Sequence, residues 1–108
     1  MKILLVCAGG LSTAMMMEEM KKVIRGSKKL DIQDFPMEAV SVDRMKEVVE
    51  KYDIVLVGPQ LKHKTDYIQK VAEPFGKAVM IIDPELYGAM DGASVLKQAL
   101  IAYHKSQM

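Results

Sequence analysis

Short apolar runs that alternate with amphipathic helical segments predict an α/β fold in which helices cover both faces of a parallel sheet. Two of these runs, Ile3-Leu4-Leu5-Val6 and Ile54-Val55-Leu56-Val57, have the continuous hydrophobicity of strands buried on both sides. Parallel strands joined through a helix almost always form right-handed crossovers. We therefore predict a single-domain, flavodoxin-like sandwich with four expected strands.

The first strand should pass directly into a helix. It ends at Gly9-Gly10, and apolar residues at helical spacing follow Ser12 and stop near Gly26. The side chains expected to face the core on this helix are Met16, Met20, Val23 and Ile24. The next segment, Leu30 to Met37, is more polar and contains Pro36, which fits an edge strand because proline lacks the N–H that a ladder needs.

A second helix should connect this edge strand to the central strand. Ser41 or Asp43 can cap the helix, whose apolar residues repeat at three and four positions: Met45, Val48, Val49 and Tyr52. The central strand ends at Gly58-Pro59. A third helix is expected between Leu61 and Phe75, with Thr65 as a possible cap and with these side chains facing the core: Ile68, Val71 and Ala72.

The last part of the chain repeats the order of strand, turn and helix. Ala78 to Ile82 is a fourth apolar run that stops at Asp83-Pro84, and Glu85 to Tyr87 can form a single turn. Gly92 precedes a final helix with a buried stripe formed by Val95, Leu96, Ala99, Leu100 and Tyr103. Ligands of such sheets bind beyond the carboxyl ends of the strands, which is where Cys7 lies.

Composition narrows the classes of function. The 108 residues are 50% hydrophobic and 27% charged, as expected for one globular domain spanning residues 1–108. A net charge of +1 gives no positive field that would attract nucleic acid or anionic lipid. The apolar opening is shorter than the ~7–15-residue core of a signal peptide, and no stretch approaches the ~18 residues of a membrane span. We therefore expect a cytoplasmic protein that binds no nucleic acid.

The loop Cys7-Ala8-Gly9-Gly10-Leu11-Ser12-Thr13 is the strongest candidate for a site. Its glycines permit backbone angles that turn several N–H groups toward one point, which makes an anion-binding nest. The following helix adds the partial positive charge of its N-terminus, and Ser12 and Thr13 add hydroxyl donors. The same field favours the thiolate of Cys7, the form that attacks phosphorus. The alternative is that Cys7 is a small buried hydrophobe at a strand end.

Other motifs limit what this loop can do. It is neither GxGxxG nor a Walker loop, so we expect no nucleotide and no other cofactor. The only cysteine has no partner in the sequence for a disulfide or a dithiol motif. Low-molecular-weight tyrosine phosphatases carry an arginine where this chain has Thr13, and without that guanidinium attack by water on a phosphocysteine is poorly stabilised. We expect Cys7 to pass phosphate on rather than hydrolyse it.

At this point the sequence resembles the lactose/cellobiose family of phosphotransferase system IIB proteins. The resemblance begins with Cys7 through Thr13 and continues along nearly the whole chain, in Asp53 through Gln60, Val79 through Asp83, Leu86 through Gly92, and Val95-Leu96-Lys97. Several motifs in the right order are more specific than the cysteine loop alone. The resemblance implies a four-stranded parallel sheet, similar to that of low-molecular-weight tyrosine phosphatase.

The family also implies a chemical role. Cys7 would be the nucleophile that takes phosphate from a phosphohistidine of a IIA protein and passes it to a sugar held by the membrane-embedded IIC permease. The sugar would belong to the cellobiose, chitobiose and lactose class. The phosphate cradle would comprise Ala8, Gly9, Gly10, Leu11, Ser12 and Thr13. The family loop more usually reads Cys-Ser-Ala-Gly-Met-Ser-Thr, so Ala8 removes a hydroxyl donor and leaves the backbone cradle.

Several other polar residues could have either a functional or an ordinary structural role. Gln60 follows the central strand and could reach the same crevice, and Asp83 and Asp91 could orient the loop, although solvated turn residues are the simpler interpretation. His63 and His104 lie beside lysines with no spaced partner for a metal site, so we expect surface residues and no metal. An exposed Met15 or Leu11 could help to dock IIA.

Two other classes of function stay open. One is a phosphatase or arsenate-reductase-like cysteine enzyme on a similar fold, against which the missing arginine and the single cysteine argue. The other is a module that only holds an anion. Oligomeric state is not visible in the pattern, although a carrier that exposes one loop to two partners in turn could work as a monomer.

Overall fold

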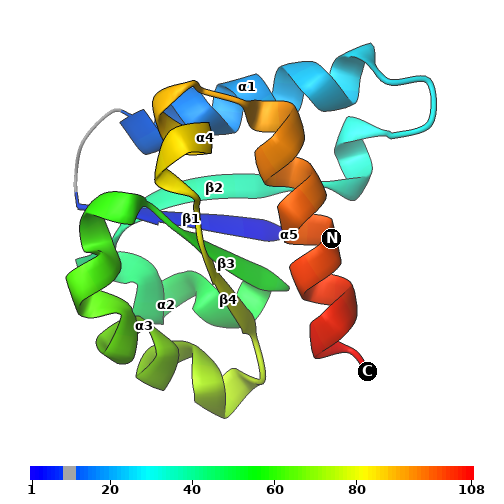
Figure 1. The fold of residues 1–108 in the computed structure, drawn as a ribbon. Coiled ribbons are helices and arrows are strands. Elements are labelled where there is room, and N and C mark those ends of the chain that lie inside the picture. The colour runs from blue at the N-terminus through cyan, green and yellow to red at the C-terminus, as the bar shows by residue number, and fades with distance from the viewer. Residues whose placement is uncertain (9–11) are drawn as a thin grey trace.

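The structure, a computed structural model, describes residues 1–8 and 12–108. Its centre is a sheet of four parallel strands in the order β2-β1-β3-β4 (Figure 1). The strands are β1 (Ile3–Cys7), β2 (Met37–Ser41), β3 (Ile54–Val57) and β4 (Ala78–Ile81). The predicted four-stranded, flavodoxin-like parallel sheet is confirmed.

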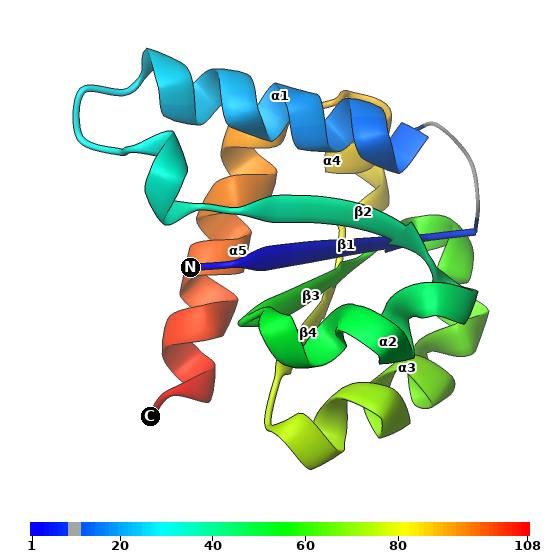
Figure 2. The same cartoon turned by 180° about the vertical axis from the view of Figure 1, so that it is seen from behind.

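Helices cover both faces of this sheet, as Figures 1 and 2 show from opposite sides. One face carries α1 (Ser12–Gly26), α4 (Pro84–Gly88) and α5 (Gly92–Ser106). The other carries α2 (Met45–Val48) and α3 (Thr65–Ala72). Short 3-10 segments precede or extend these elements at Ile32–Asp34, Val42–Arg44, Val49–Lys51, Pro59–Lys64 and Glu73–Phe75.

Alternation along the strands divides the apolar side chains between two cores. Ile3 and Leu5 of β1 point toward the face of α1 and α5, whereas Leu4 and Val6 point toward the face of α2 and α3. The first core is completed by helix residues Met16, Met20, Ile24, Tyr87, Val95, Leu96 and Ala99, and the second by Met45, Val49, Leu61, Ile68 and Ala72. The helical periodicity in the sequence therefore identified the buried sides correctly.

The predicted edge strand was displaced along the chain. β2 is at the edge of the sheet, as expected, but it begins at Met37 instead of occupying residues 30–37. The Asp31 carboxylate accepts a hydrogen bond of 2.9 Å from the Gln33 amide and starts a 3-10 turn there. This local bond competes with strand pairing. Pro36 lies just before β2, and its carbonyl accepts the Ile3 amide at 2.8 Å.

The predicted helix caps were also wrong. Asp43 lies inside the 3-10 turn Val42–Arg44, and Ser41 precedes that turn without a side-chain capping bond to any described residue. Thr65 does not cap α3, because its hydroxyl donates to the Lys62 carbonyl at 2.6 Å instead. The chain enters α2 and α3 through 3-10 turns, which use up backbone groups that a capping side chain would otherwise satisfy.

Candidate functional site

Cys7 ends β1 at the point where successive connections leave the sheet on opposite faces. After β1 the chain continues into α1 on one face, and after the neighbouring β3 it continues into α3 on the other (Figures 1 and 2). Such a topological switch point is where ligands bind in open α/β sheets. Cys7, the nucleophile predicted from the sequence, therefore lies where ligands bind in this class of fold.

Cys7 is almost fully buried and contacts the edge strand β2. The residue is 9% exposed, and its Sγ donates a weak hydrogen bond to the Val40 carbonyl on β2 at 3.5 Å. The first turn of an α-helix leaves N–H groups without helical partners, and α1 follows Cys7 in the chain, so its start could supply such donors to an anion at this end of the sheet.

Helix α1 begins with a turn that suits an anion. Its fifteen residues start at Ser12, and the first turn contains no acidic side chain. Thr13, in that turn, is fully buried, and its Oγ1 lies 3.1 Å from the hydroxyl of Tyr87 on α4. The predicted cradle residues Gly9, Gly10 and Leu11 lie outside the described residues, and only the backbone of Ser12 is described.

Gln60 is brought to this end of the sheet from the neighbouring strand. Gly58 follows β3, and its amide donates to the Val6 carbonyl at 3.0 Å. A Cβ atom built on Gly58 would lie 2.8 Å from Gln60 Oε1 and 3.6 Å from Thr13 Oγ1. The exposed Gln60 side chain therefore folds back over Gly58, and its Oε1 lies on the side of that glycine where Thr13 Oγ1 also lies.

The two candidate aspartates are engaged at helix starts. Asp83 accepts the Glu85 amide at 2.8 Å and caps α4, and Asp91 accepts the amide of Ser94 at 3.1 Å and its hydroxyl at 2.8 Å to cap α5. The bond from the Ser94 amide, followed by that from its hydroxyl, lowers the pKa of Asp91. Both carboxylates therefore hold α4 and α5, the helices that pack with α1 on this face of the sheet.

Tyr87 is the residue that sequence reasoning did not single out. Its ring is buried in the core between the sheet, α1 and α5, and its hydroxyl meets Thr13, which is 74 positions away in the chain. The stretch Leu86-Tyr87-Gly88 could have pointed to this residue. A tyrosine in a single turn buries its ring against the core, and its hydroxyl then needs a hydrogen-bond partner.

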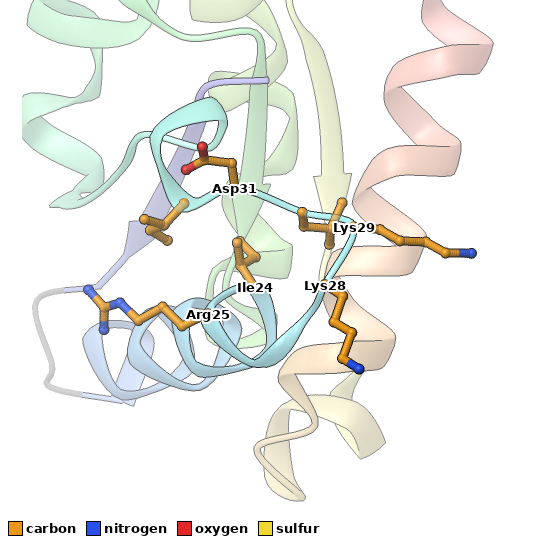
Figure 3. A pocket seen from close by; sticks show the side chains of 7 residues that line it. Ile24, Arg25, Lys28, Lys29 and Asp31 are labelled. Carbon is orange, nitrogen blue, oxygen red and sulfur yellow. The ribbon is translucent and has the colours of Figure 1, made fainter.

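A hollow of about 430 Å³ lies away from this site. It is formed by the last turn of α1 and the chain that follows, Ile24, Arg25 and residues 28–32. At ~1.5 Å per residue, α1 separates it from the end of β1 by about 20 Å. Figure 3 shows the side chains of Arg25, Lys28 and Lys29 pointing in different directions, so these cations do not converge on one ligand.

The remaining candidates are surface residues. His63 and His104 are exposed, as predicted. Among residues 1–8 and 12–108, no three His, Cys, Asp or Glu side chains gather closely enough to hold a metal ion. The helices of this described part are also too short or too polar to cross a membrane.

The fold and the site define a flavodoxin-like protein with a cysteine at the switch point of its sheet. Residues 2–98 match the family described as "PTS system, Lactose/Cellobiose specific IIB subunit". The oligo-beta-mannoside-specific EIIB component of Bacillus subtilis is 35% identical, over 92% of each chain. The cellobiose-specific EIIB component of Lactococcus lactis is 32% identical over 90% of this chain and 91% of its own.

Solved structures agree with these relatives. The cellobiose-specific IIB component from Borrelia burgdorferi has a TM-score of 0.78 and 34% identity, with 98% of this chain and 94% of that one covered. The lactose-specific IIB domain from Streptococcus pneumoniae, at 16% identity and a TM-score of 0.79 over 95% and 97% of the two chains, shares the fold. This chain belongs to the lactose/cellobiose-specific IIB family of the phosphotransferase system.

Proposed function

We propose that Cys7 carries a phosphoryl group from a phosphohistidine of a IIA protein to a sugar held by the IIC permease. In the first step the thiolate forms an S–P bond as the N–P bond of the histidine breaks. In the second step a sugar hydroxyl forms an O–P bond as the S–P bond breaks, and the hydroxyl proton is lost. The observation that carries this proposal is the position of Cys7, which ends β1 at the switch point of the sheet, on the connection that leads to α1.

Two features favour transfer over hydrolysis. The position of the phosphatase arginine holds Thr13, whose buried hydroxyl bonds to Tyr87 and cannot supply a bidentate cation. Cys7 is 9% exposed, which limits the access of bulk water to its sulfur before a partner docks. The phosphocysteine should therefore persist until an acceptor docks, which is what a carrier requires.

The rest of the proposal follows from the family. The backbone of residues 8–13 forms the phosphate cradle, with Gln60 as an accessory ligand and Asp83 and Asp91 as supports for the surrounding helices. Relatives named for oligo-beta-mannoside, cellobiose and galactose point to a sugar of the cellobiose, chitobiose and lactose class. We place this carrier in the cytoplasm as a single 1–108 domain and a monomer, with no cofactor and no nucleic acid partner.

The first test is intact mass after incubation with phosphoenolpyruvate, the general phosphotransferase proteins and IIA proteins of both the cellobiose and the lactose type. Wild type should gain one phosphoryl group, and Cys7→Ser should gain none. If every IIA is phosphorylated and wild type stays unmodified, the carrier role is wrong and the chain is an anion-binding module. Rapid, Cys7-dependent hydrolysis of an aryl phosphate would favour the phosphatase instead.

The surface around the start of α1 should dock IIA, because a histidine of that protein has to reach Cys7. Met15 is 57% exposed and borders an apolar hollow of about 310 Å³ with Ala14, Glu18 and Glu19. The double substitution Leu11→Glu and Met15→Glu should slow phosphorylation by IIA and leave the melting temperature unchanged. Ile101→Glu on α5, at a residue 46% exposed, is the matched control. Equal transfer rates in the two variants would show that this surface does not dock IIA.

A further inference from the structure

We propose that Tyr87 is a positioning residue of the phosphotransfer site, which directs the hydroxyl hydrogen of Thr13 toward the phosphoryl group on Cys7. This inference rests on the carrier function proposed for Cys7. It assigns to α4, an element far along the chain from the cysteine loop, a part in the phosphotransfer step.

The contact between the two hydroxyl groups is buried. Thr13 is completely inaccessible, Tyr87 is 6% exposed, and their oxygens are 3.1 Å apart. A hydroxyl removed from water needs a partner, and a buried pair of this kind is held in one geometry more strictly than a surface pair. The contact with Tyr87 therefore restricts the rotation of the Thr13 hydroxyl.

The proposed role requires Tyr87 to be the donor in this hydrogen bond. Either hydroxyl can donate in this pair, and we assign the hydrogen to Tyr87 because a phenol is the more acidic of the two groups. Thr13 then keeps its own hydrogen for another acceptor. A threonine deep in a helix would give that hydrogen to the carbonyl four residues earlier, but Thr13 is the second residue of α1, so the position four residues earlier lies outside the helix.

An anion near the α1 N-terminus is the acceptor that this arrangement suits. Hydrogen bonds in a chain polarise one another, so donation from Tyr87 makes Thr13 a stronger donor to a phosphoryl oxygen. The Thr13 oxygen also lies near Gly58, whose amide bonds to the carbonyl of Val6, the residue before Cys7. The Thr13 hydroxyl is thus close to the junction from which the cysteine loop departs.

Helix α4 holds Tyr87 in place from both ends. At its start the Asp83 side chain caps the helix, and the Tyr87 amide donates to the Asp83 carbonyl at 2.9 Å. At its end the Met90 amide donates to the Tyr87 carbonyl at 3.1 Å and the Asp91 amide to the Leu86 carbonyl at 3.0 Å. These two bonds close a Schellman motif with Met90 at a φ of 52°. A non-glycine residue stays in that region only where its neighbours over-determine the geometry.

The test compares variants that differ by one hydroxyl. Transfer from excess phosphorylated IIA to Cys7 would be followed by rapid quench and intact mass for wild type, Tyr87→Phe, Thr13→Val and Thr13→Ser. Loss of one buried hydrogen bond of about 1 kcal/mol predicts a rate three- to ten-fold lower for Tyr87→Phe and Thr13→Val. Thr13→Ser keeps the hydroxyl and should retain more activity than Thr13→Val, although it removes a buried methyl group. Tyr103→Phe on α5 is the matched control.

A double variant distinguishes a positioning role of Tyr87 from a general loss of stability. If Tyr87 acts through Thr13, the double variant Tyr87→Phe, Thr13→Val should be no slower than the slower single variant. Variants that lack either hydroxyl should transfer more slowly than variants that keep both, whatever the ranking of their melting temperatures. Wild-type transfer in Tyr87→Phe, or a Thr13→Ser rate as low as that of Thr13→Val, would overturn this inference alone. Failure of wild type to form phosphocysteine would overturn the carrier function instead.

Discussion

Gly92 should be the least replaceable glycine among the described residues because α1 and α5 touch through it. It is the first residue of α5, and a Cβ atom there would lie 2.7 Å from the carbonyl carbon of Glu19, 2.7 Å from the amide nitrogen of Met20 and 2.8 Å from the Glu19 oxygen. All three are backbone atoms of α1. They cannot rotate away as a flexible side chain would.

The cost of Gly92→Ala follows from this geometry. Ordinary carbon contacts are about 3.5–4.0 Å, so the helices have to separate by about 1 Å, which forfeits dispersion energy along their whole contact. Overpacking of this kind costs about 1–3 kcal/mol, against at most ~1 kcal/mol gained from replacing a helical glycine by alanine. With that gain subtracted, a net loss of about 1–2 kcal/mol should lower the melting temperature of a chain of this size by roughly 4–16 °C.

The assay is thermal unfolding by circular dichroism, with Gly88→Ala as the matched control. Gly88 is the last residue of α4, and a Cβ there would have no described atom within 4 Å. The control should melt at the wild-type temperature or slightly above it. If Gly92→Ala melts no lower than Gly88→Ala, the close approach of α1 and α5 does not constrain this position and the reasoning fails.

Three further outcomes test individual contacts. Because hydrogen bonds from Ser94 lower the pKa of Asp91, their stabilisation is complete above about pH 4 and is lost as the pH falls through the lowered pKa. The melting-temperature gap between wild type and Asp91→Asn should therefore close in acid, and a constant gap would contradict this. Burial, and then the bond to Glu38, raises the pKa of Tyr52 to about 12. The stabilisation that Tyr52 contributes is present below its ordinary pKa of about 10 and is lost as the pH rises through about 12. The absorbance of ionised Tyr52, measured as wild type minus Tyr52→Phe during a pH titration, should therefore rise near pH 12, and a rise near pH 10 would refute the raised pKa. Gly76 has a φ of 67° and no described atom within 4 Å of its Cβ position, so Gly76→Ala should cost only the conformational strain, about 1 kcal/mol by denaturant titration; an unchanged midpoint would count against that strain.

Local pattern was enough for much of the fold. The unbroken apolar runs at residues 3–6 and 54–57 predicted the two central strands, because a strand covered on both faces needs apolar side chains on both. Helical spacing likewise identified the buried sides of α1, α3 and α5. The weakest prediction fell at the edge of the sheet, where one bond from Asp31 to the Gln33 amide outweighs a polar strand signal.

The sequence by itself determined where Cys7 would lie, since a strand-to-helix junction is a local event and the carboxyl ends of parallel strands meet at one edge. Only the tertiary structure decided what surrounds that junction. The pairing of Thr13 with Tyr87, the fold of Gln60 over Gly58 and the contact of Gly92 with the α1 backbone join residues far apart in the chain. Periodicity reports which side of an element is buried, but it does not report which element covers it, because that depends on how the helices pack across the sheet.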